Sequence, residues 1–133
     1  MGPMNWIAVV VGTVAFFAVG AIWYSALFPR AWQREVGLST EQLTSGRNMM
    51  LIMGTCLLLE FIIALTIGHM FDYLEPSARS KMMIAVGLAL GIMAPAIGIN
   101  YLYMRKSLKL WLIDSGHFIA GMAALGGVFV LLD

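Results

Sequence analysis

Residues 48–71, NMMLIMGTCLLLEFIIALTIGHMF, form a long apolar stretch in which Glu60 is the only acidic or basic residue apart from a histidine near its end. An α-helix needs about 20 mostly apolar residues to cross the hydrocarbon core of a bilayer, and this stretch is long enough. It also lacks the alternation of apolar and polar residues that a strand of a membrane barrel shows. We therefore predict a transmembrane helix with one carboxyl group near its middle.

Three other stretches have the same apolar character. They lie at about residues 4–28, 82–104 and 110–132. The sequence is 61% hydrophobic and 11% charged, which is about half the charged share of a typical soluble domain. We predict a single all-α membrane domain over residues 1–133, built as an up-down bundle of four transmembrane helices. Residues 1–3, ahead of Met4, are expected to be a foreign extension outside this fold.

Basic residues are distributed unequally between the two ends of such a bundle. The connections after the first and third spans contain Arg30, Arg34, Arg47, Arg105, Lys106 and Lys109, and the opposite side contains Arg79 and Lys81. Aromatic residues gather near the basic ends, as in an interfacial belt: Trp23, Tyr24, Trp32, Tyr101, Tyr103 and Trp111. The positive-inside rule then predicts cytoplasmic basic connections and both termini outside. With a net charge of +1, no basic face beyond these membrane flanks indicates a nucleic-acid partner.

The first connection shows its own helix signals. Pro29 and Gly37 bracket a short helical segment, and Ser39 and Gln42 have the spacing of a capping box. We predict a short interfacial helix before the second span.

Small residues form stripes on two of the predicted spans. The stripe on the third span consists of Gly87, Gly91, Ala94 and Gly98, and that on the fourth consists of Gly116, Ala120, Ala123 and Gly127. Small residues let helices approach closely in a bilayer, where no hydrophobic force drives them together. The fourth span combines a small face with a polar face, so it can pack within the bundle or against a second copy. A homo-oligomer and intramolecular packing both remain open.

Polar residues at membrane depth indicate where a site should lie. A charged carboxyl group at the position of Glu60 costs about 2.5–3.5 kcal/mol on insertion scales, so it should face protein or water. Asp114 and His117 are three residues apart and share one helix face. Tyr24, Ser25 and Asn100 belong to the other two spans, in the same predicted cytoplasmic half. The sequence predicts a polar interior in that half, with the lipid bilayer as its surroundings.

Three interpretations of this polar interior compete. In the first, it binds or translocates a proton, an ion or a small solute. In the second, its polar contacts only fix the packing of the helices in a structural or accessory subunit. In the third, it is a metal site. One chain supplies only three suitable metal ligands, Glu60, Asp114 and His117, and a single cysteine, Cys56, so we expect no metal and no cofactor. Without a Walker loop, a nucleophile elbow or a zinc-protease helix, the sequence favours a non-enzymatic role and offers no catalytic residue.

Several motifs resemble those of a known family. They are Met4-Asn5-Trp6, Trp23-Tyr24-Ser25, Gly37-Leu38-Ser39, Ser107-Leu108-Lys109-Leu110 and Ile113-Asp114-Ser115-Gly116-His117. Together they resemble the bacterial membrane family called domain of unknown function 1761. The resemblance implies a four-helix bacterial membrane protein and brings no activity. We expect the protein to lie in the bacterial inner (plasma) membrane. This chain departs from the family pattern at two positions: Ala26 stands where a proline is frequent, and Asp114 stands where an asparagine is usual. The resemblance therefore does not imply an ionic pair between Glu60 and the fourth span.

Overall fold

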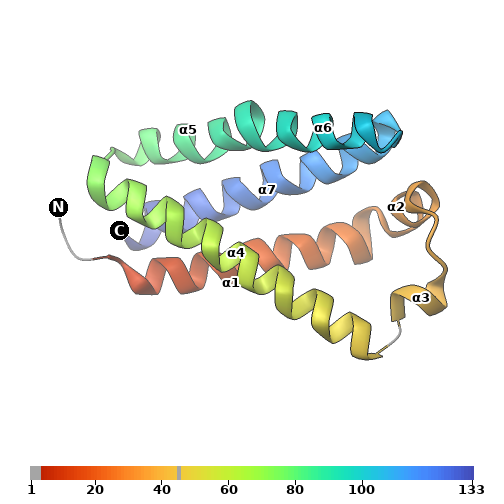
Figure 1. Cartoon of the computed structure of the whole chain (residues 1–133). Coiled ribbons are helices and arrows are strands. Elements are labelled where there is room, and N and C mark those ends of the chain that lie inside the picture. The colour runs from red at the N-terminus through yellow and green to blue at the C-terminus, as the bar shows by residue number, and fades with distance from the viewer. Residues whose placement is uncertain (1–3, 45) are drawn as a thin grey trace.

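The computed structural model describes residues 4–44 and 46–133, so the expected foreign extension at residues 1–3 lies outside the described residues. The described part of the chain consists of helices and short connections (Figure 1). In chain order the elements are α1 (Trp6–Ile22), the π-helical η1 (Trp23–Leu27), α2 (Pro29–Val36), α3 (Thr40–Thr44), α4 (Gly46–Leu74), α5 (Ala78–Leu88), the π-helical η2 (Ala89–Met93), α6 (Ala94–Tyr103) and α7 (Leu108–Leu132).

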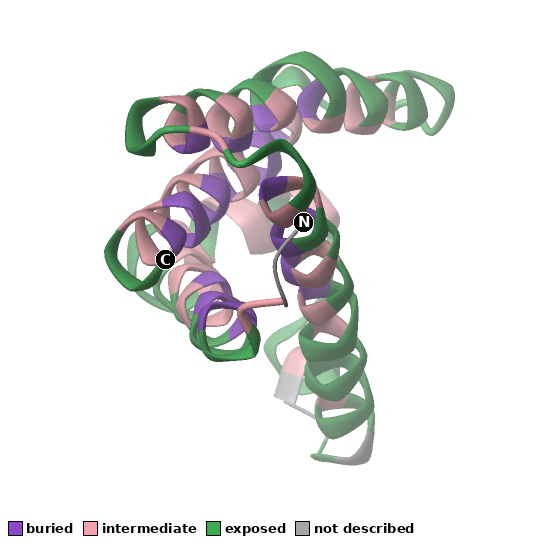
Figure 2. Cartoon of the chain, turned by 90° about the vertical axis from the view of Figure 1, so that its left-hand side faces the viewer, coloured by how far each residue is buried: buried purple, intermediate pink, exposed green. Residues whose placement is uncertain are grey.

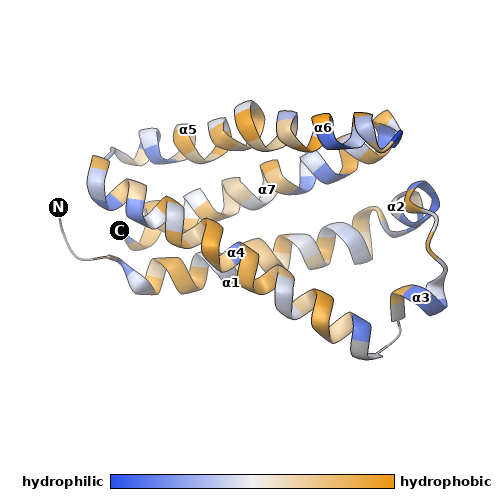
Figure 3. Ribbon diagram, in the orientation of Figure 1, coloured by the Kyte–Doolittle hydropathy of each residue, from blue (hydrophilic) through white to orange (hydrophobic). Residues whose placement is uncertain are grey.

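Four helical segments are long and apolar enough to cross a membrane. They are Trp6–Leu27, Asn48–Leu74, Ala78–Tyr103 and Leu108–Leu132. Hydrophobic residues dominate along these segments, and hydrophilic ones collect at the connections between them (Figure 3). The predicted fold class is therefore confirmed, and the chain is a multi-pass membrane protein.

Side-chain caps begin the first, third and fourth spans. Asn5 accepts a hydrogen bond from the amide of Ala8 at 3.0 Å, Ser77 from that of Ser80 at 3.2 Å, and Ser107 from that of Leu110. Each cap satisfies an amide that has no partner within its own helix.

The first connection contains two short helices where the sequence predicted one. Gly37 ends α2 in the left-handed conformation, with φ 81°, which glycine adopts without steric cost. The predicted capping box follows: the Ser39 amide donates to Gln42 Oε1 at 2.8 Å, and the Gln42 amide donates to Ser39 Oγ at 3.1 Å.

Helix α7 lies at the centre of the bundle. It packs against α1 on one side and against α5, η2 and α6 on the other, while α1 also packs against α4. Buried residues line the inward faces and exposed ones cover the outside, as expected for a protein surrounded by lipid (Figure 2). We call the end with Asn5, Ser77 and Asp133 the terminal end, and the end with α2, α3 and Ser107 the basic end.

Glycines on α1 and α7 make room for large side chains on the opposite helix. A Cβ atom on Gly121 would lie 2.7 Å from the ring of Phe16, and one on Gly116 would lie 2.8 Å from the ring of Trp23. In the other direction, a Cβ on Gly20 would lie 2.9 Å from His117 Nε2. This interlocking holds α1 and α7 close together at the depth of the polar residues.

Both π-helical segments end two residues before a proline. The Phe28 amide bonds to the Trp23 carbonyl just ahead of Pro29, and the Ala94 amide bonds to the Ala89 carbonyl just ahead of Pro95. A proline ring collides with the carbonyl four residues earlier, and a wider π turn relieves that collision. Each π segment also inserts one extra residue into its helix.

The extra residue in η2 splits the small-residue stripe predicted for the third span, and that prediction is corrected here. The inward face runs through Ala85, Ala89 and Ala94, whereas Gly87 and Gly91 are exposed with open space beside them. Gly98 does face α7, where the Trp111 indole fills the space over it.

The stripe predicted for the fourth span is also divided. Gly116 packs on Trp23, but Gly127 has open space beside it. Ala120 and Ala123 are half-buried. A second copy of the chain packing on the open positions stays a prediction.

Candidate functional site

Asp114 carries a buried carboxyl group that two tyrosines hold. Only 8% of the residue is exposed. The Tyr24 hydroxyl, from η1, donates to Oδ1 at 2.5 Å, and the Tyr101 hydroxyl, from α6, donates to Oδ2. Both carboxyl oxygens thus accept from neutral donors, and in the described part of the chain no basic side chain forms a salt bridge with Asp114.

His117 lies one helical turn from Asp114 and is also buried, with 9% exposed. Its ring packs edge-on against Phe16 and Tyr24, with ring centroids 5.7 and 5.0 Å away, and lies 4.8 Å from Phe118. Neither ring nitrogen has a hydrogen-bond partner among the described residues. Tyr24 therefore contacts both polar groups, because its ring packs on His117 while its hydroxyl bonds to Asp114.

Glu60 lies at the point where α4 separates from the bundle. It begins an inward face that continues through Ala64, Ile67 and Phe71, whereas no described residue of α4 before it is buried. The residue is 8% exposed, and its Oε1 is buried with no partner in the described chain. Glu60 thus faces protein as predicted, but no hydrogen bond described in the structure joins it to Asp114 or His117.

Helix packing explains why Glu60 is not bonded to the other polar residues. At its terminal end α4 reaches α7, where the rings of Phe71 and Phe129 meet at 5.4 Å. Toward the basic end α4 diverges from the other helices (Figure 1), and its inward face packs on α1.

Two predicted lining residues lie outside the interior, and their placement is corrected here. Ser25 is exposed, and its hydroxyl donates to the Ala21 carbonyl of the preceding turn. Asn100 is also exposed, because the inward face of α6 contains its neighbour Tyr101 instead. The spacing of Ala94, Gly98 and Tyr101 contains this signal, since residues three and seven positions apart share a helix face.

Several aromatic residues predicted to form an interfacial belt are turned inward. The Trp23 indole donates to the Ile113 carbonyl at 2.8 Å, and the Trp111 indole donates to the Ala94 carbonyl at 2.8 Å. Tyr103, by contrast, is 81% exposed. We use the name polar cluster for Tyr24, Tyr101, Asp114 and His117, which these indole bonds flank.

The polar cluster does not have the composition of a metal centre. Within residues 4–44 and 46–133, no group of three or more histidine, cysteine or carboxylate side chains is placed to hold a metal ion. The carboxyl oxygens of Asp114 already accept from phenols.

Comparison with protein-family models identifies the family. The model described as "Protein of unknown function (DUF1761)" matches residues 7–130, which is nearly the whole chain. The chain belongs to this family. No curated protein and no solved structure matches it. Membership in the DUF1761 family agrees with the resemblance in the sequence motifs and assigns no activity.

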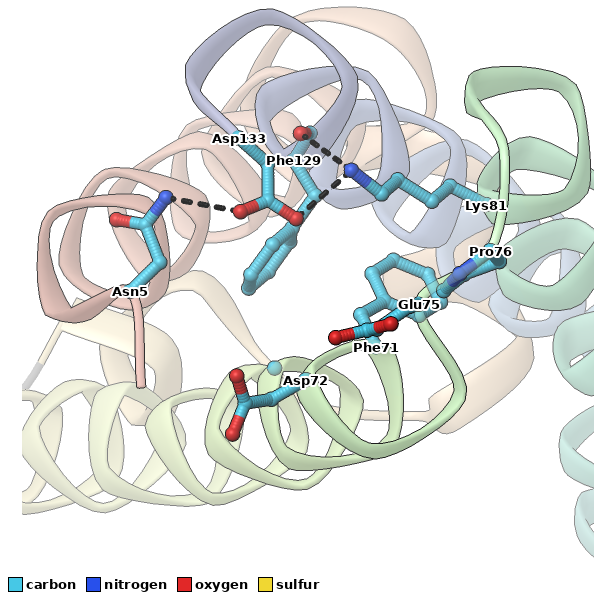
Figure 4. A pocket seen from close by; sticks show the side chains of 9 residues that line it. Asn5, Phe71, Asp72, Glu75, Pro76, Lys81, Phe129 and Asp133 are labelled. Atoms are coloured by element: carbon cyan, nitrogen blue, oxygen red, sulfur yellow. Dashed lines mark hydrogen bonds and ion pairs between the residues drawn. The ribbon is translucent and has the colours of Figure 1, made fainter. Parts of the chain in front are cut away.

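The DUF1761 chain also has a cavity of about 380 Å³ at its terminal end (Figure 4). Lys81 Nζ pairs with Asp133 Oδ2 at 2.7 Å, and Asn5 donates to Asp133 Oδ1 at 3.3 Å. The hydrogen bond from Lys81 lowers the pKa of the Asp133 carboxyl below its ordinary value. Asp72 and Glu75 lie across the cavity from this pair.

The pair at the terminal end was not predicted from the sequence, where Lys81 counted as a membrane flank. Lys81 precedes the inward-facing Ala85 and Ala89 by four and eight residues, so it lies on the same helix face. It is 9% exposed and joins the start of α5 to the end of α7.

Proposed function

We propose that this protein binds a proton reversibly at the polar cluster and passes it through the interior of the basic half. One observation carries the proposal. A buried carboxyl group without a basic partner lies one turn from a buried imidazole whose two nitrogens both lack partners in the described chain. An unsatisfied buried polar group costs about 1–3 kcal/mol. Histidine beside a carboxylate is well suited to gaining and losing a proton near neutral pH.

A proton fits the polar cluster better than a metal ion or a larger solute. The tyrosine hydroxyls direct hydrogens at Asp114, whereas a cation would need oxygen lone pairs directed at it. Aromatic rings close the space around His117. A proton needs neither additional ligands nor room.

Glu60 is the deep acceptor in this proposal. It would exchange a proton with the polar cluster across α1 through water or through movement of α4, and the divergence of α4 at the basic end (Figure 1) supports such movement. We further propose that the basic connections face the cytoplasm of a bacterial inner membrane, with both termini outside, on the positive-inside bias alone.

A second candidate function is structural. The bonds of Tyr24 and Tyr101 to Asp114, together with the Trp23 and Trp111 indole bonds, join η1, α6 and α7. A subunit that only has to hold its helices in register needs these contacts and no proton exchange. Oligomeric assembly is compatible with either function.

Proton flux into liposomes separates the two functions. Purified protein is reconstituted around a trapped pH-sensitive dye, and the decay of an imposed pH gradient is followed. We expect the wild type to speed the decay, and Asp114→Asn and His117→Gln to reduce that rate roughly tenfold or more, as removal of a proton-transfer group does. Glu60→Gln should also reduce it.

His69→Gln provides the matched control, because His69 is an exposed histidine on α4 and should leave the flux unchanged. A wild-type rate equal to that of empty liposomes would exclude proton passage and favour the structural function. Equal flux in wild type and Glu60→Gln would remove Glu60 from the route.

A further inference from the structure

A hollow of about 420 Å³ lies at the basic end, where η1 meets α2. Its lining consists of Ala26, Leu27, Phe28, Pro29, Arg30, Ala31 and Arg34. Ligand pockets in proteins commonly measure about 300–1,000 Å³. This lining combines two guanidinium groups with a purely apolar remainder, and no acidic residue takes part in it.

Contacts on the opposite face of α2 hold the two arginines in place. Trp32 packs on the ring of Tyr24 with centroids 5.5 Å apart, and Glu35 accepts a hydrogen bond from the Ser107 hydroxyl at the start of α7. Arg30 and Arg34 are four residues apart and therefore share a face, which is directed away from these contacts. The bundle thus fixes α2 with both guanidinium groups beside the hollow.

Neither arginine is neutralised within the described part of the chain. Arg30 and Arg34 are exposed, and no described carboxylate forms a salt bridge with either. The nearest acid in sequence, Glu35, is bonded to Ser107 instead. Two adjacent guanidinium groups without a carboxylate have the donor geometry that recognises phosphate.

We propose that this hollow binds the phosphate headgroup of an anionic phospholipid from the surrounding leaflet. The apolar wall decides between a lipid and a free phosphate ion. Leu27 is 57% exposed and ends a membrane-spanning segment, so it lies at the interface where the glycerol and upper acyl chain of a phospholipid are found. A free phosphate ion would gain no binding energy from the apolar side chains of this lining. Basic residues beside a span are attracted to anionic lipids in this way, and the inference is independent of the proton proposal.

Native mass spectrometry of the full-length protein in detergent tests this site. The protein is titrated with phosphatidylglycerol or with phosphatidylcholine, and the fraction that retains lipid gives an apparent Kd. We expect phosphatidylglycerol to be preferred. Each arginine contributes roughly fivefold in affinity, so Arg30→Gln/Arg34→Gln should weaken phosphatidylglycerol binding by about twentyfold or more. Arg30→Lys/Arg34→Lys keeps the charge and should retain part of the affinity.

Lys106→Gln/Lys109→Gln is the matched control, because it removes two charges from the same end of the bundle but outside the hollow. This variant should stay within about twofold of the wild type. An equal loss in both double variants would show a diffuse basic surface and overturn the proposal, as would equal binding of the two lipids. Inorganic phosphate that displaces the lipid stoichiometrically at low millimolar concentration would show a free-phosphate site and would also overturn it.

Discussion

At the scale of single residues, Asp114 depends on its two tyrosine donors. Asp114→Asn preserves size and removes the charge. Because an amide group has only one acceptor oxygen, one of the two tyrosine hydroxyls loses its acceptor. Polar contacts between membrane helices contribute about 1 kcal/mol each, and we expect a loss of about 1–2 kcal/mol in the free energy of unfolding. Reversible unfolding in mixed detergent micelles measures it.

Asp72→Asn is the control for this substitution. Asp72 lies at the terminal end and forms no hydrogen bond or salt bridge that the structure describes, so its replacement should change the free energy of unfolding little. Equal effects of the two substitutions would show that the tyrosine bonds to Asp114 do not stabilise the bundle.

Part of the polar cluster was predictable residue by residue. The three-residue spacing of Asp114 and His117 puts both on one face, and Tyr24 ends a span at the matching depth. The hydrogen-bonding role of Tyr101 was missed, because the face that Ala94, Gly98 and Tyr101 share was not identified as the inward one. Depth along a span follows directly from sequence position, whereas spacing alone does not say which helix face points inward. The same reason explains why Asn100 and Ser25 were expected inside and lie outside.

At the scale of helices, the packing of α1 on α7 depends on glycines. Gly121→Ala would force a methyl group to within 2.7 Å of the ring of Phe16, which is fully buried. Overpacking of this kind costs about 1–3 kcal/mol. Gly127→Ala on the same helix meets open space and should be close to neutral. The thermal midpoints of the two variants in detergent give the comparison, and similar midpoints would contradict the interlocked packing.

The ion pair between Lys81 and Asp133 predicts that the stability of the bundle depends on pH. Because the folded state lowers the pKa of Asp133, its stabilising contribution is present above the ordinary carboxyl pKa of 3.8 and is lost as pH falls through the lowered value. Asp133→Asn should therefore lower the unfolding temperature at pH 6 and have little effect near pH 2. A difference of the same size at both pH values would contradict this assignment.

Proline explains why the helix faces of the third span were only partly predictable. The stripe of small residues was predicted from the regular spacing of a continuous α-helix, and η2, which ends two residues ahead of Pro95, interrupts that spacing. The π turn of η2 inserts one residue, so Gly87 and Gly91 lie on a different face from Ala94 and Gly98. The first span shows the same π turn ahead of Pro29. In this chain, a proline inside or at the end of an apolar span is therefore a signal for a π turn just before it.

At the scale of the whole molecule, the four spans followed from apolar length alone, because a bilayer imposes the same minimum on each. Sequence patterns did not predict the separation of α4 from the other helices, since its apolar residues surround the helix and lipid accepts any of them. The central place of α7 was likewise not predicted.

The arrangement of four spans predicts which connections share a side of the membrane. In a Cys56→Ser background, Ala78→Cys should react with a membrane-impermeant maleimide added to intact cells. Glu41→Cys should react only after permeabilisation, if the basic connections are cytoplasmic. Both introduced positions are exposed. Labelling of both in intact cells would contradict the four-span topology, and the reverse pattern would invert the proposed orientation.

The central claim is that the polar cluster exchanges a proton, and nuclear magnetic resonance of the His117 ring tests it most directly. The chain has two histidines, so His69→Gln protein labelled with ¹⁵N-histidine reports on His117 alone in lipid nanodiscs. The account predicts that the ring nitrogen resonances change between neutral and protonated forms over about pH 5–8, and that Asp114→Asn alters this titration. Resonances that stay constant across that range in both proteins would contradict it.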